Sequence, residues 1–240
     1  MTGFQFEAAG ITDVGLKRRA NEDSLLLRDS ECLWVVADGM GGHRAGDWAS
    51  GQIRDGLQNL ALTGDFDRDL ALIGNAVHAI NARIFEESQK AGAMMGSTVV
   101  VLHCCGDRFA VFWAGDSRVY LRRGGELYRI TTDHSEVQEL VAAGLIGEEE
   151  ARLHPRRNII TRAVGTAPEL TLDVIADRLE AGDIFLLCSD GLTSVASDEE
   201  IGECLDVTPF PDITGVLLKF TLARGAPDNV TVAAILCKPA

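Results

Sequence analysis

Apolar residues recur along this chain with two different periods. Two segments, 44–62 and 67–90, have the spacing of amphipathic helices. Their apolar faces carry Ile53, Leu57 and Leu60 in the first segment, and Leu70, Ile73, Val77, Ile80 and Ile84 in the second. Shorter apolar runs, several of them separated by Gly-Asp or Gly-Gly, predict strands joined by hairpins. These strands are expected at residues 4–12, 24–29, 33–38, 97–105, 108–115, 117–125, 126–131, 171–179, 183–190 and 229–238.

The remaining segments are more polar, and they predict further helices. A mixed segment at 134–165 contains a short helical pattern at 135–144, and helices are also expected at 198–205 and 213–223. The runs VVVL and IFLL are apolar without alternation, as in strands that are covered on both faces. A chain of 240 residues can bury one substantial core, so we expect a single domain over 1–240 with helices covering the sheets. Strand connectivity does not follow from periodicity.

The formal net charge of the chain is −14, which argues against nucleic acid or an anionic membrane surface as the main partner. No apolar run approaches the roughly 18 residues that a membrane span requires. The first residues, MTGFQFEAAG, lack the basic start and apolar centre of a signal peptide. We therefore expect a cytoplasmic protein, in which an anionic substrate would need local positive charge from arginines or bound cations.

The chain has 6 cysteines, and no two of them have CxxC spacing. Cys104 and Cys105 are adjacent in an expected strand, where neighbouring side chains point to opposite faces. A bond between these two is therefore not expected. Buried free thiols in a reducing compartment are the simplest interpretation.

Four aspartates lie where expected strands end or begin. Asp38 and Asp190 each close a strand with Asp-Gly, Asp116 leaves one through Gly-Asp, and Asp228 precedes the last strand. A single acid at a strand end is most often a turn former or a helix cap. If several of these ends meet at one edge, the like charges require either raised pKa values or bound cations. Ligands that are all oxygen atoms favour Mg²⁺ or Mn²⁺ over Zn²⁺.

A glycine-rich loop follows Asp38 and raises the alternative of a nucleotide-phosphate cradle between a strand and a helix. However, Asp47 and Trp48 stand where a Walker-type loop needs Lys and Ser or Thr. Arg44 stands where a G-x-G-x-x-G pattern needs its third glycine. The glycines instead allow the backbone to pass close to an ion, so that the Gly39 carbonyl can itself be a ligand.

Six stretches of the chain together resemble the motifs of a known family. They are GLKRRANEDS (15–24), VVADGMGGHRAGDWAS (35–50), MGSTVVV (95–101), WAGDSRVYL (113–121), LCSDGL (187–192) and APDNVTVAAI (226–235). In this order they resemble the metal-dependent Ser/Thr protein phosphatases (PPM, the type 2C phosphatases) in their compact bacterial form. The resemblance implies an α+β fold, a four-layer αββα sandwich of two antiparallel β-sheets flanked by helix pairs. It also implies that the polar segment 134–165 is a small flap subdomain.

The resemblance further implies two tightly bound Mn²⁺ or Mg²⁺ ions at one end of the sandwich. Asp38 would bridge the two ions. The Gly39 carbonyl would be a ligand of the second ion, while Asp190 and Asp228 would be ligands of the first. Glu22 would lie near the second ion and bind it through a water molecule.

Other matching positions surround this set. Asp116 matches the position that holds a third, weaker ion in bacterial members, and Asp23 and Asn229 would support the ligands from behind. Arg18 matches the arginine that binds the substrate phosphate. His43 matches the histidine that gives a proton to the leaving group. The implied reaction is hydrolysis of phosphoserine and phosphothreonine monoesters by a water activated by the two ions.

The implied partners are phosphoprotein substrates and a Ser/Thr kinase of the Hanks type, and we expect a monomer. Three alternatives stay open: a PPM-fold regulator acting on one anti-sigma-type antagonist, a non-catalytic phosphoprotein-binding or metal-sensing domain, and another metallohydrolase such as a phosphodiesterase. The segment 134–165 and the complete acidic set favour a broader bacterial phosphatase. Arg156, Arg157 and Arg162 in that segment are either substrate contacts or solvent-exposed side chains.

Overall fold

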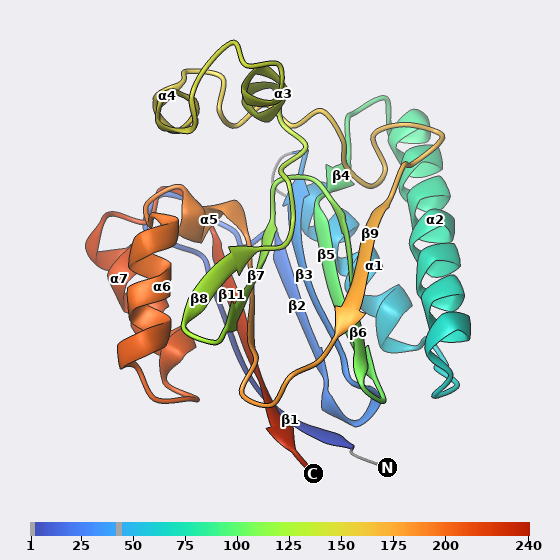
Figure 1. Cartoon of the computed structure of the whole chain (residues 1–240). Helices are drawn as coiled ribbons and strands as arrows, with labels where there is room; N and C mark the ends of the chain where they lie inside the picture. Colours follow the sequence, from blue (N-terminus) through green and yellow to red (C-terminus); the bar gives the residue numbers. More distant parts are fainter. Residues whose placement is uncertain (1–2, 42–44) are drawn as a thin grey trace.

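The computed structural model describes residues 3–41 and 45–240, and its strands form two antiparallel sheets that face each other (Figure 1). The order of strands in the first sheet is β1 (Phe4–Asp13), β11 (Val230–Pro239), β10 (Ile184–Cys188), β7 (Arg118–Arg123) and β8 (Glu126–Arg129). The order in the second is β2 (Asp23–Arg28), β3 (Leu33–Met40), β5 (Val99–Cys105), β6 (Arg108–Ala114) and β9 (Asp173–Arg178). The short β4 (Gly96–Ser97) pairs with the end of β3.

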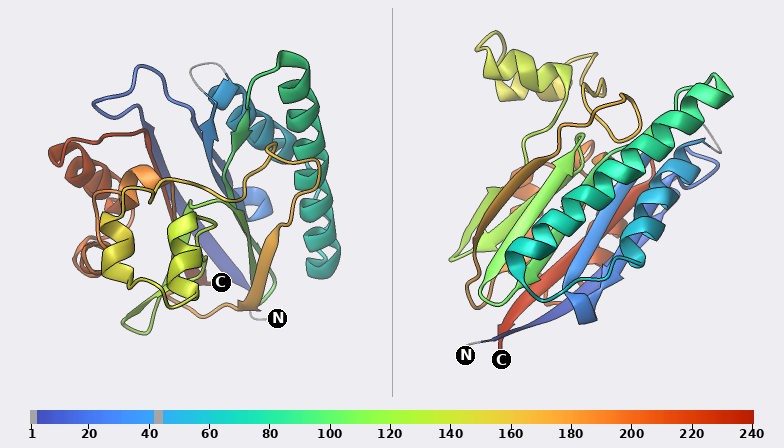
Figure 2. Two further views of the ribbon diagram at one scale, coloured as in Figure 1. Left: turned by 90° about the horizontal axis from the view of Figure 1, so that it is seen from above. Right: turned by 90° about the vertical axis from the view of Figure 1, so that its right-hand side faces the viewer.

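Helices cover the outer face of each sheet, so that the layers run αββα (Figures 1 and 2). The second sheet is covered by α1 (Ala45–Gln58) and α2 (Phe66–Ala91). The first sheet is covered by α5 (Asp190–Thr193), α6 (Asp198–Val207) and α7 (Ile213–Ala223). The α+β sandwich expected from the sequence is confirmed.

Successive side chains along each strand point to opposite faces of the sheet, so each strand contributes apolar residues to the core on both faces. On β3, Val35 packs towards α1 and α2, while Trp34 and Val36 pack between the sheets. On β10, Phe185 packs between the sheets and Leu186 packs towards the other helices. Burial on both faces explains why these strands are apolar without alternation.

The segment 134–165, called the flap segment below, lies above the end of the sandwich that is opposite both chain termini (Figure 1). It carries the predicted helix α3 (Glu136–Ala142) and a further helix, α4 (Glu148–Leu153), that was not predicted. The acidic first turn of α4 follows Gly147, and acidic residues favour a helix N-terminus. The sequence therefore held a signal for α4.

The end of α1 differs from the prediction. The helix was expected to reach Leu62, but it ends at Gln58, and Leu60 packs against the core from the following loop. Arg28 donates hydrogen bonds to the carbonyls of Leu57 (2.7 Å) and Leu60 (2.9 Å). This buried guanidinium satisfies carbonyl groups at the helix end, a contact that periodicity does not reveal.

The six cysteines are free. Cys104 packs between the sheets while Cys105 packs on the side of α1 and α2, so the two adjacent side chains do point to opposite faces, as predicted. Among the described helices, none combines the length and apolar composition needed to span a bilayer.

Candidate functional site

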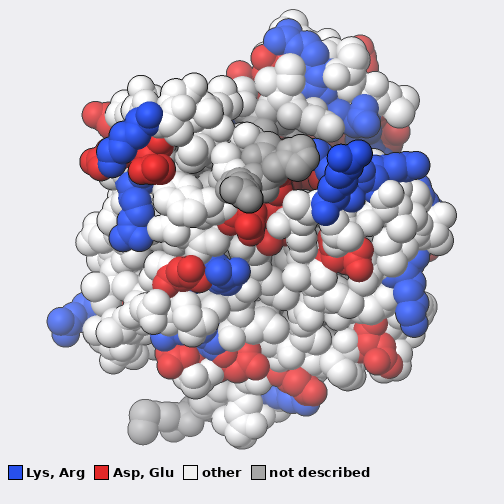
Figure 3. All heavy atoms as spheres, turned by 180° about the vertical axis from the view of Figure 1, so that it is seen from behind, with Lys and Arg blue, Asp and Glu red and all other residues white. Residues whose placement is uncertain are grey.

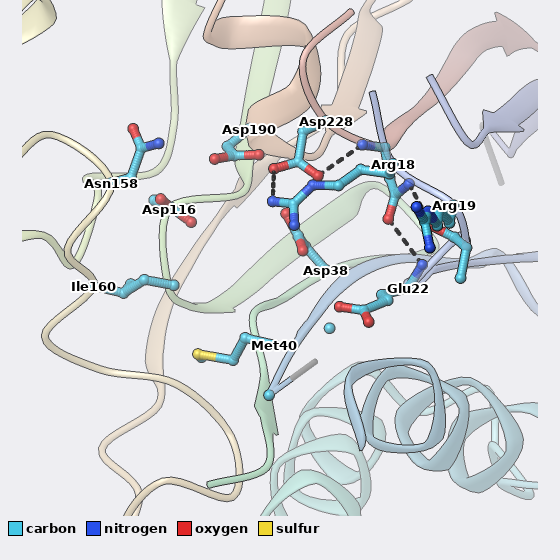
Figure 4. A pocket seen from close by; sticks show the side chains of 14 residues that line it. Arg18, Arg19, Glu22, Asp38, Met40, Asp116, Asn158, Ile160, Asp190 and Asp228 are labelled. Atoms are coloured by element: carbon cyan, nitrogen blue, oxygen red, sulfur yellow. Dashed lines mark hydrogen bonds and ion pairs between the residues drawn. The ribbon is translucent and has the colours of Figure 1, made fainter. Parts of the chain in front are cut away.

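The strand ends that carry the predicted aspartates meet beneath the flap segment, at one end of the sandwich (Figure 4). They surround a pocket of about 330 Å³. Predicted site residues that line it are Arg18, Glu22, Asp38, Gly39, Asp116, Asp190, Asp228 and Asn229. Viewed from behind, acidic side chains gather in a hollow of the surface with basic side chains beside them (Figure 3).

Strand pairing positions Asp38. It lies opposite Asp23 in the antiparallel register of β2 and β3. Its backbone N–H donates to the Thr98 hydroxyl (3.0 Å), and its carbonyl accepts from the Thr98 N–H (2.8 Å) and the Ser97 hydroxyl (3.0 Å). The backbone of Asp38 is therefore fixed on both sides, and its carboxylate is left to face the pocket (Figure 4).

Gly39 allows two other chain segments to lie close to the backbone next to Asp38. Its N–H donates to the Glu22 carbonyl (3.1 Å). A Cβ at this position would lie 2.1 Å from the carbonyl oxygen of Gly46 and 2.6 Å from that of Glu22. No larger residue fits without backbone movement, because real contacts of a Cβ are never so short.

Asn229 connects the last strand to the N-terminal loop. Its side-chain carbonyl accepts from the Glu22 N–H (2.8 Å), and its amide donates to the carbonyls of Val14 and Ala20 (2.9 Å each). The loop that carries Arg18 is thereby held against the strand end that carries Asp228. Asn229 thus holds this loop by three hydrogen bonds.

Asp23 lies buried behind the pocket. Its Oδ2 accepts hydrogen bonds from the hydroxyls of Ser189 (2.8 Å) and Thr231 (2.7 Å). Burial raises the pKa of Asp23 to about 7, against the lowering effect of these two hydrogen bonds. Thr231 was not predicted as a supporting residue. Its position two residues after Asn229, the spacing of side chains that share a face of a strand, was the available signal.

Three carboxyl groups of the pocket, those of Asp38, Asp116 and Asp190, have raised pKa values. Burial is the main cause of the raised pKa of Asp38 and of Asp116, and neighbouring carboxylates raise both further. Burial also raises the pKa of Asp190 to about 6, with the Asp228 carboxylate as the next cause. Such groups cannot all be ionised near neutral pH without compensating positive charge.

The donor set fits hard divalent cations. Every side-chain ligand expected from the sequence is a carboxylate, and Mn²⁺ and Mg²⁺ prefer oxygen ligands. The Oδ1 atom of Asp190 is buried and has no hydrogen-bond partner among the described residues. An acceptor left unsatisfied in this way is unfavourable unless a cation or a water completes it.

Arg18 supplies positive charge in the conformation described. Its Nη2 donates to Oδ2 of Asp228 at 2.6 Å, so the guanidinium lies among the carboxylates (Figure 4). This hydrogen bond is the main cause of the raised pKa of Arg18. In the part of the chain that the structure describes, no three Asp, Glu, His or Cys side chains form a preassembled metal cluster. A cation held by Asp228 would share this carboxylate with Arg18 or displace the guanidinium.

His43, the expected proton donor, lies outside the described residues. The flap segment contributes two pocket residues that the sequence interpretation did not name, Asn158 and Ile160 (Figure 4). Arg162, by contrast, is bonded to Asp173 at the edge of the second sheet (2.6 Å). Which flap residues reach the pocket depends on how the segment folds back, and no periodic pattern indicates it.

Comparisons with known proteins identify the family of this chain. The family model for Protein phosphatase 2C matches residues 10–140. The chain is 37% identical to "Protein phosphatase PhpP" of Streptococcus pneumoniae, over 95% of this chain and 96% of that protein. It is 40% identical to "Serine/threonine protein phosphatase PstP" of Mycobacterium tuberculosis, over 93% of this chain and 43% of that longer protein.

Solved structures with the same fold include PppA, described as a key regulatory component of T6SS in Pseudomonas aeruginosa. It has a TM-score of 0.91 and 39% identity, and the match covers 99% of this chain and 100% of that one. The catalytic domain of PstP in complex with two manganese ions has a TM-score of 0.88 and 37% identity, with 98% and 99% covered. The chain thus belongs to the protein phosphatase 2C family, the metal-dependent serine/threonine protein phosphatases.

Proposed function

We propose that this protein hydrolyses phosphoserine and phosphothreonine monoesters in phosphoproteins, opposing a Ser/Thr kinase of the Hanks type. The observation that carries the proposal is the convergence of Asp38, Asp116, Asp190 and Asp228 on one pocket, with Arg18 beside them. A phosphomonoester brings negative charge to this pocket. Its hydrolysis therefore needs both cations and a donor that recognises phosphate.

The residues that would hold two Mn²⁺ or Mg²⁺ ions are Asp38, between both ions, the Gly39 carbonyl, Asp190, Asp228 and, through a water, Glu22. When bound, the ions supply Lewis acidity to the phosphoryl oxygens and a water of lowered pKa as nucleophile. Asp116 would hold a third, weaker ion. The raised pKa values of Asp38, Asp116 and Asp190 support this proposal, because a bound cation is the natural compensation for buried carboxylates.

The side chains of this chain then have separate tasks. Arg18 would bind oxygens of the substrate phosphoryl group, since a guanidinium matches phosphate geometry. Asp23 and Asn229 keep the neighbouring strand ends in place through the hydrogen bonds described above. His43 donates a proton to the serine or threonine alkoxide as it leaves.

The protein is proposed to act as a cytoplasmic monomer. A phosphodiesterase or a non-catalytic phosphoprotein-binding domain would use a similar acidic pocket differently. A regulator with one antagonist as substrate would act on few phosphoproteins.

Hydrolysis of para-nitrophenyl phosphate, of its bis ester and of phosphothreonine peptides, each with and without Mn²⁺, tests the proposal. Metal-dependent turnover of the monoester and of several unrelated peptides is expected, with the bis ester nearly inert. Preferential turnover of the bis ester would favour a phosphodiesterase, and binding without turnover would favour the non-catalytic domain.

A further inference from the structure

The turn between β6 and β7 carries Asp116 into the catalytic pocket. Thr98 contacts this turn on both sides of the aspartate. The hydroxyl groups of Thr98 and Ser117 lie 2.7 Å apart, and a Cβ on Gly115 would lie 2.6 Å from the Cβ of Thr98. Since Thr98 also bonds to the backbone of Asp38, the two aspartates are placed relative to each other by the residues that flank Asp116.

His134 holds the same turn at a second point. Its backbone N–H donates to the Gly115 carbonyl (2.9 Å), and its ring nitrogen Nδ1 accepts from the Gly115 N–H (3.1 Å). The ring is buried and stacks on Trp113, with 6.2 Å between the ring centroids and 11° between the planes. The reaction described above gives this histidine no part, yet it makes two hydrogen bonds to the residue that precedes Asp116.

The hydrogen bond from Gly115 fixes the tautomer of the His134 ring. An Nδ1 atom that accepts carries no proton, so the neutral ring has its proton on Nε2. This Nε2 atom lies 3.3 Å from Oδ2 of Asp173 and 3.0 Å from Nη1 of Arg162. Because Nε2 and Nη1 are both donors, the Asp173 carboxylate accepts from each of them, with Arg162 at 2.6 Å. Burial is the main cause of the lowered pKa of His134, followed by the charge of Arg162, and both favour the neutral ring.

We propose that His134 is a positioning residue of the phosphatase reaction: its Nδ1 atom, kept free of a proton by the Asp173 contact at Nε2, fixes the Gly115 N–H and so directs the Asp116 carboxylate towards the third-ion site. This inference rests on the proposed function and adds to it a residue that touches neither substrate nor ion. Gly115 has a φ of +113°, a backbone conformation that few residues adopt, and the contacts with Thr98 and His134 hold it there.

Loss of this hydrogen bond should affect the weak ion and not the two tight ones. An ion that keeps most of its water has few protein ligands, so a displaced Asp116 carboxylate removes much of its contact with the protein. Asp38, Asp190 and Asp228 lie at the ends of other strands, so the two tight sites do not depend on the turn that His134 holds.

Two replacements separate the roles of the two ring nitrogens. His134→Asn places a carbonyl oxygen near the position of Nδ1, so it keeps an acceptor for the Gly115 N–H and loses the contact with Asp173. His134→Gln places an amide near the position of Nε2, so it keeps a donor to Asp173 and loses the acceptor for Gly115. Both lose the ring that stacks on Trp113, and each is therefore the matched control for the other.

We expect His134→Gln to raise the Mn²⁺ concentration at which kcat is half-maximal about tenfold, the effect of losing one hydrogen bond to a buried donor. His134→Asn should stay within about twofold of the wild type. Calorimetry should show unchanged tight binding of two Mn²⁺ ions in both variants. In the metal-free protein, exchange of the Gly115 amide hydrogen, followed by NMR, should be at least about tenfold faster in His134→Gln than in His134→Asn.

An equal metal dependence of kcat in the two variants, or equal exchange of the Gly115 amide, would overturn the inference. So would a loss of tight Mn²⁺ binding in His134→Gln. Failure of the wild type to hydrolyse any phosphopeptide would instead overturn the proposed function, and the Gly115 exchange rates would still decide whether His134 holds the turn.

Asp173→Ala provides a test that leaves the ring in place, should replacement of the buried His134 prevent folding. It removes the acceptor that keeps the proton on Nε2, while the Asp173 side chain itself is 38% exposed. The Mn²⁺ dependence of kcat and the Gly115 exchange rate should shift in the same direction as in His134→Gln. Wild-type values of both in Asp173→Ala would contradict the proposed role of the tautomer.

Discussion

The guanidinium of Arg18 is hydrogen-bonded to the carboxylate of Asp228 at 2.6 Å, across 210 residues of sequence. The sequence assigned the first residue to the substrate phosphate and the second to a metal ion. In the conformation described, the guanidinium nitrogen proposed to bind phosphate is bonded to the carboxylate oxygen proposed to bind a metal ion. In the proposed mechanism, Arg18 competes with a cation for Asp228 before it binds the substrate phosphate.

Replacing Arg18 by alanine should have opposite effects on the two ligands. KM for phosphothreonine peptides should rise about tenfold with a smaller change in kcat, because a charge-assisted contact to phosphate is lost. Affinity for Mn²⁺ should stay equal or increase, because a competing cation is removed. Steady-state kinetics and calorimetric titration of Mn²⁺ measure the two effects, with Lys17→Ala as the control. Weaker Mn²⁺ binding with an unchanged KM would mean that Arg18 only supports Asp228.

Asp38→Asn should abolish turnover without unfolding the protein. The change removes the negative charge proposed to lie between two cations, while the Asp38 backbone hydrogen bonds to Thr98 remain. We expect kcat to fall at least about 100-fold, as for other single essential groups. The melting temperature of the metal-free protein should rise, since one buried charge is lost. Asp47→Asn, in the first turn of α1, is the control. Retention of more than about a tenth of wild-type kcat would exclude the bridging role.

Residues whose positions follow from local pattern were predicted well. Asp38 and Asp190 each follow an apolar run. A strand that is buried on both faces ends where the sheet meets solvent, so a polar residue directly after it lies at that end of the sheet. Gly39 follows Asp38 where two chain segments nearly touch, a requirement that glycine alone meets. The fold class was specified mainly by the family motifs, because periodicity does not determine which strands pair.

Features that depend on contacts distant in sequence were not predictable in this way. Thr231 reaches Asp23 only because β11 crosses behind β2 at one particular register. Asn158 and Ile160 line the pocket because the flap segment folds back over it. At the early end of α1, the Leu57 carbonyl accepts a hydrogen bond from Arg28, which lies in β2. In each case the decisive partner is set by the tertiary fold and not by neighbours in sequence.

The stability of the metal-free protein should fall as pH rises through the range of the perturbed carboxyl groups. The folded-state pKa values of Asp23 and Asp190 are about 7 and about 6, above their ordinary value of 3.8. Between the ordinary pKa of 3.8 and the raised pKa of each group, the folded state holds a proton that the unfolded chain has released. The contribution of these groups is therefore fully present below about pH 4 and is lost as pH rises through about 6 to 7.

Thermal melts in a chelator, from about pH 5 to about pH 8, measure this dependence. Asp190→Asn should flatten the profile, and Mn²⁺ should raise the melting temperature most at the upper end. A wild-type profile that is flat, or that rises with pH in this range and is unchanged by Asp190→Asn, would contradict the raised pKa values.

His43→Ala should slow the hydrolysis of phosphoserine and phosphothreonine peptides more than that of para-nitrophenyl phosphate. An alkoxide leaving group needs a proton, whereas an aryl oxide scarcely does. We expect a loss of kcat of about 100-fold on the peptides and a much smaller loss on the aryl ester. Equal losses on both substrates would instead assign His43 a role in positioning water or the loop. His78→Ala, on the exposed face of α2, is the control.

Asp116 provides the sharpest test of the proposed third ion. It follows Gly115 at the end of β6, is buried, and lines the catalytic pocket. As a turn residue alone, it would contribute to folding and not to turnover. As a weak ligand of an ion that keeps most of its water, it would be needed for kcat at ordinary metal concentrations and would contribute little to binding of the first two ions.

Asp116→Asn separates these possibilities, because it keeps the shape of the side chain and removes its charge. We expect calorimetry to show that tight binding of two Mn²⁺ ions is unchanged. At the same time kcat should fall, and its dependence on Mn²⁺ should shift towards about millimolar concentrations, the range of weak hydrated sites. Without metal, the melting temperature should not decrease, since a buried carboxylate with a raised pKa has been neutralised. A decreased melting temperature with an unchanged metal dependence of kcat would show that Asp116 serves only the turn.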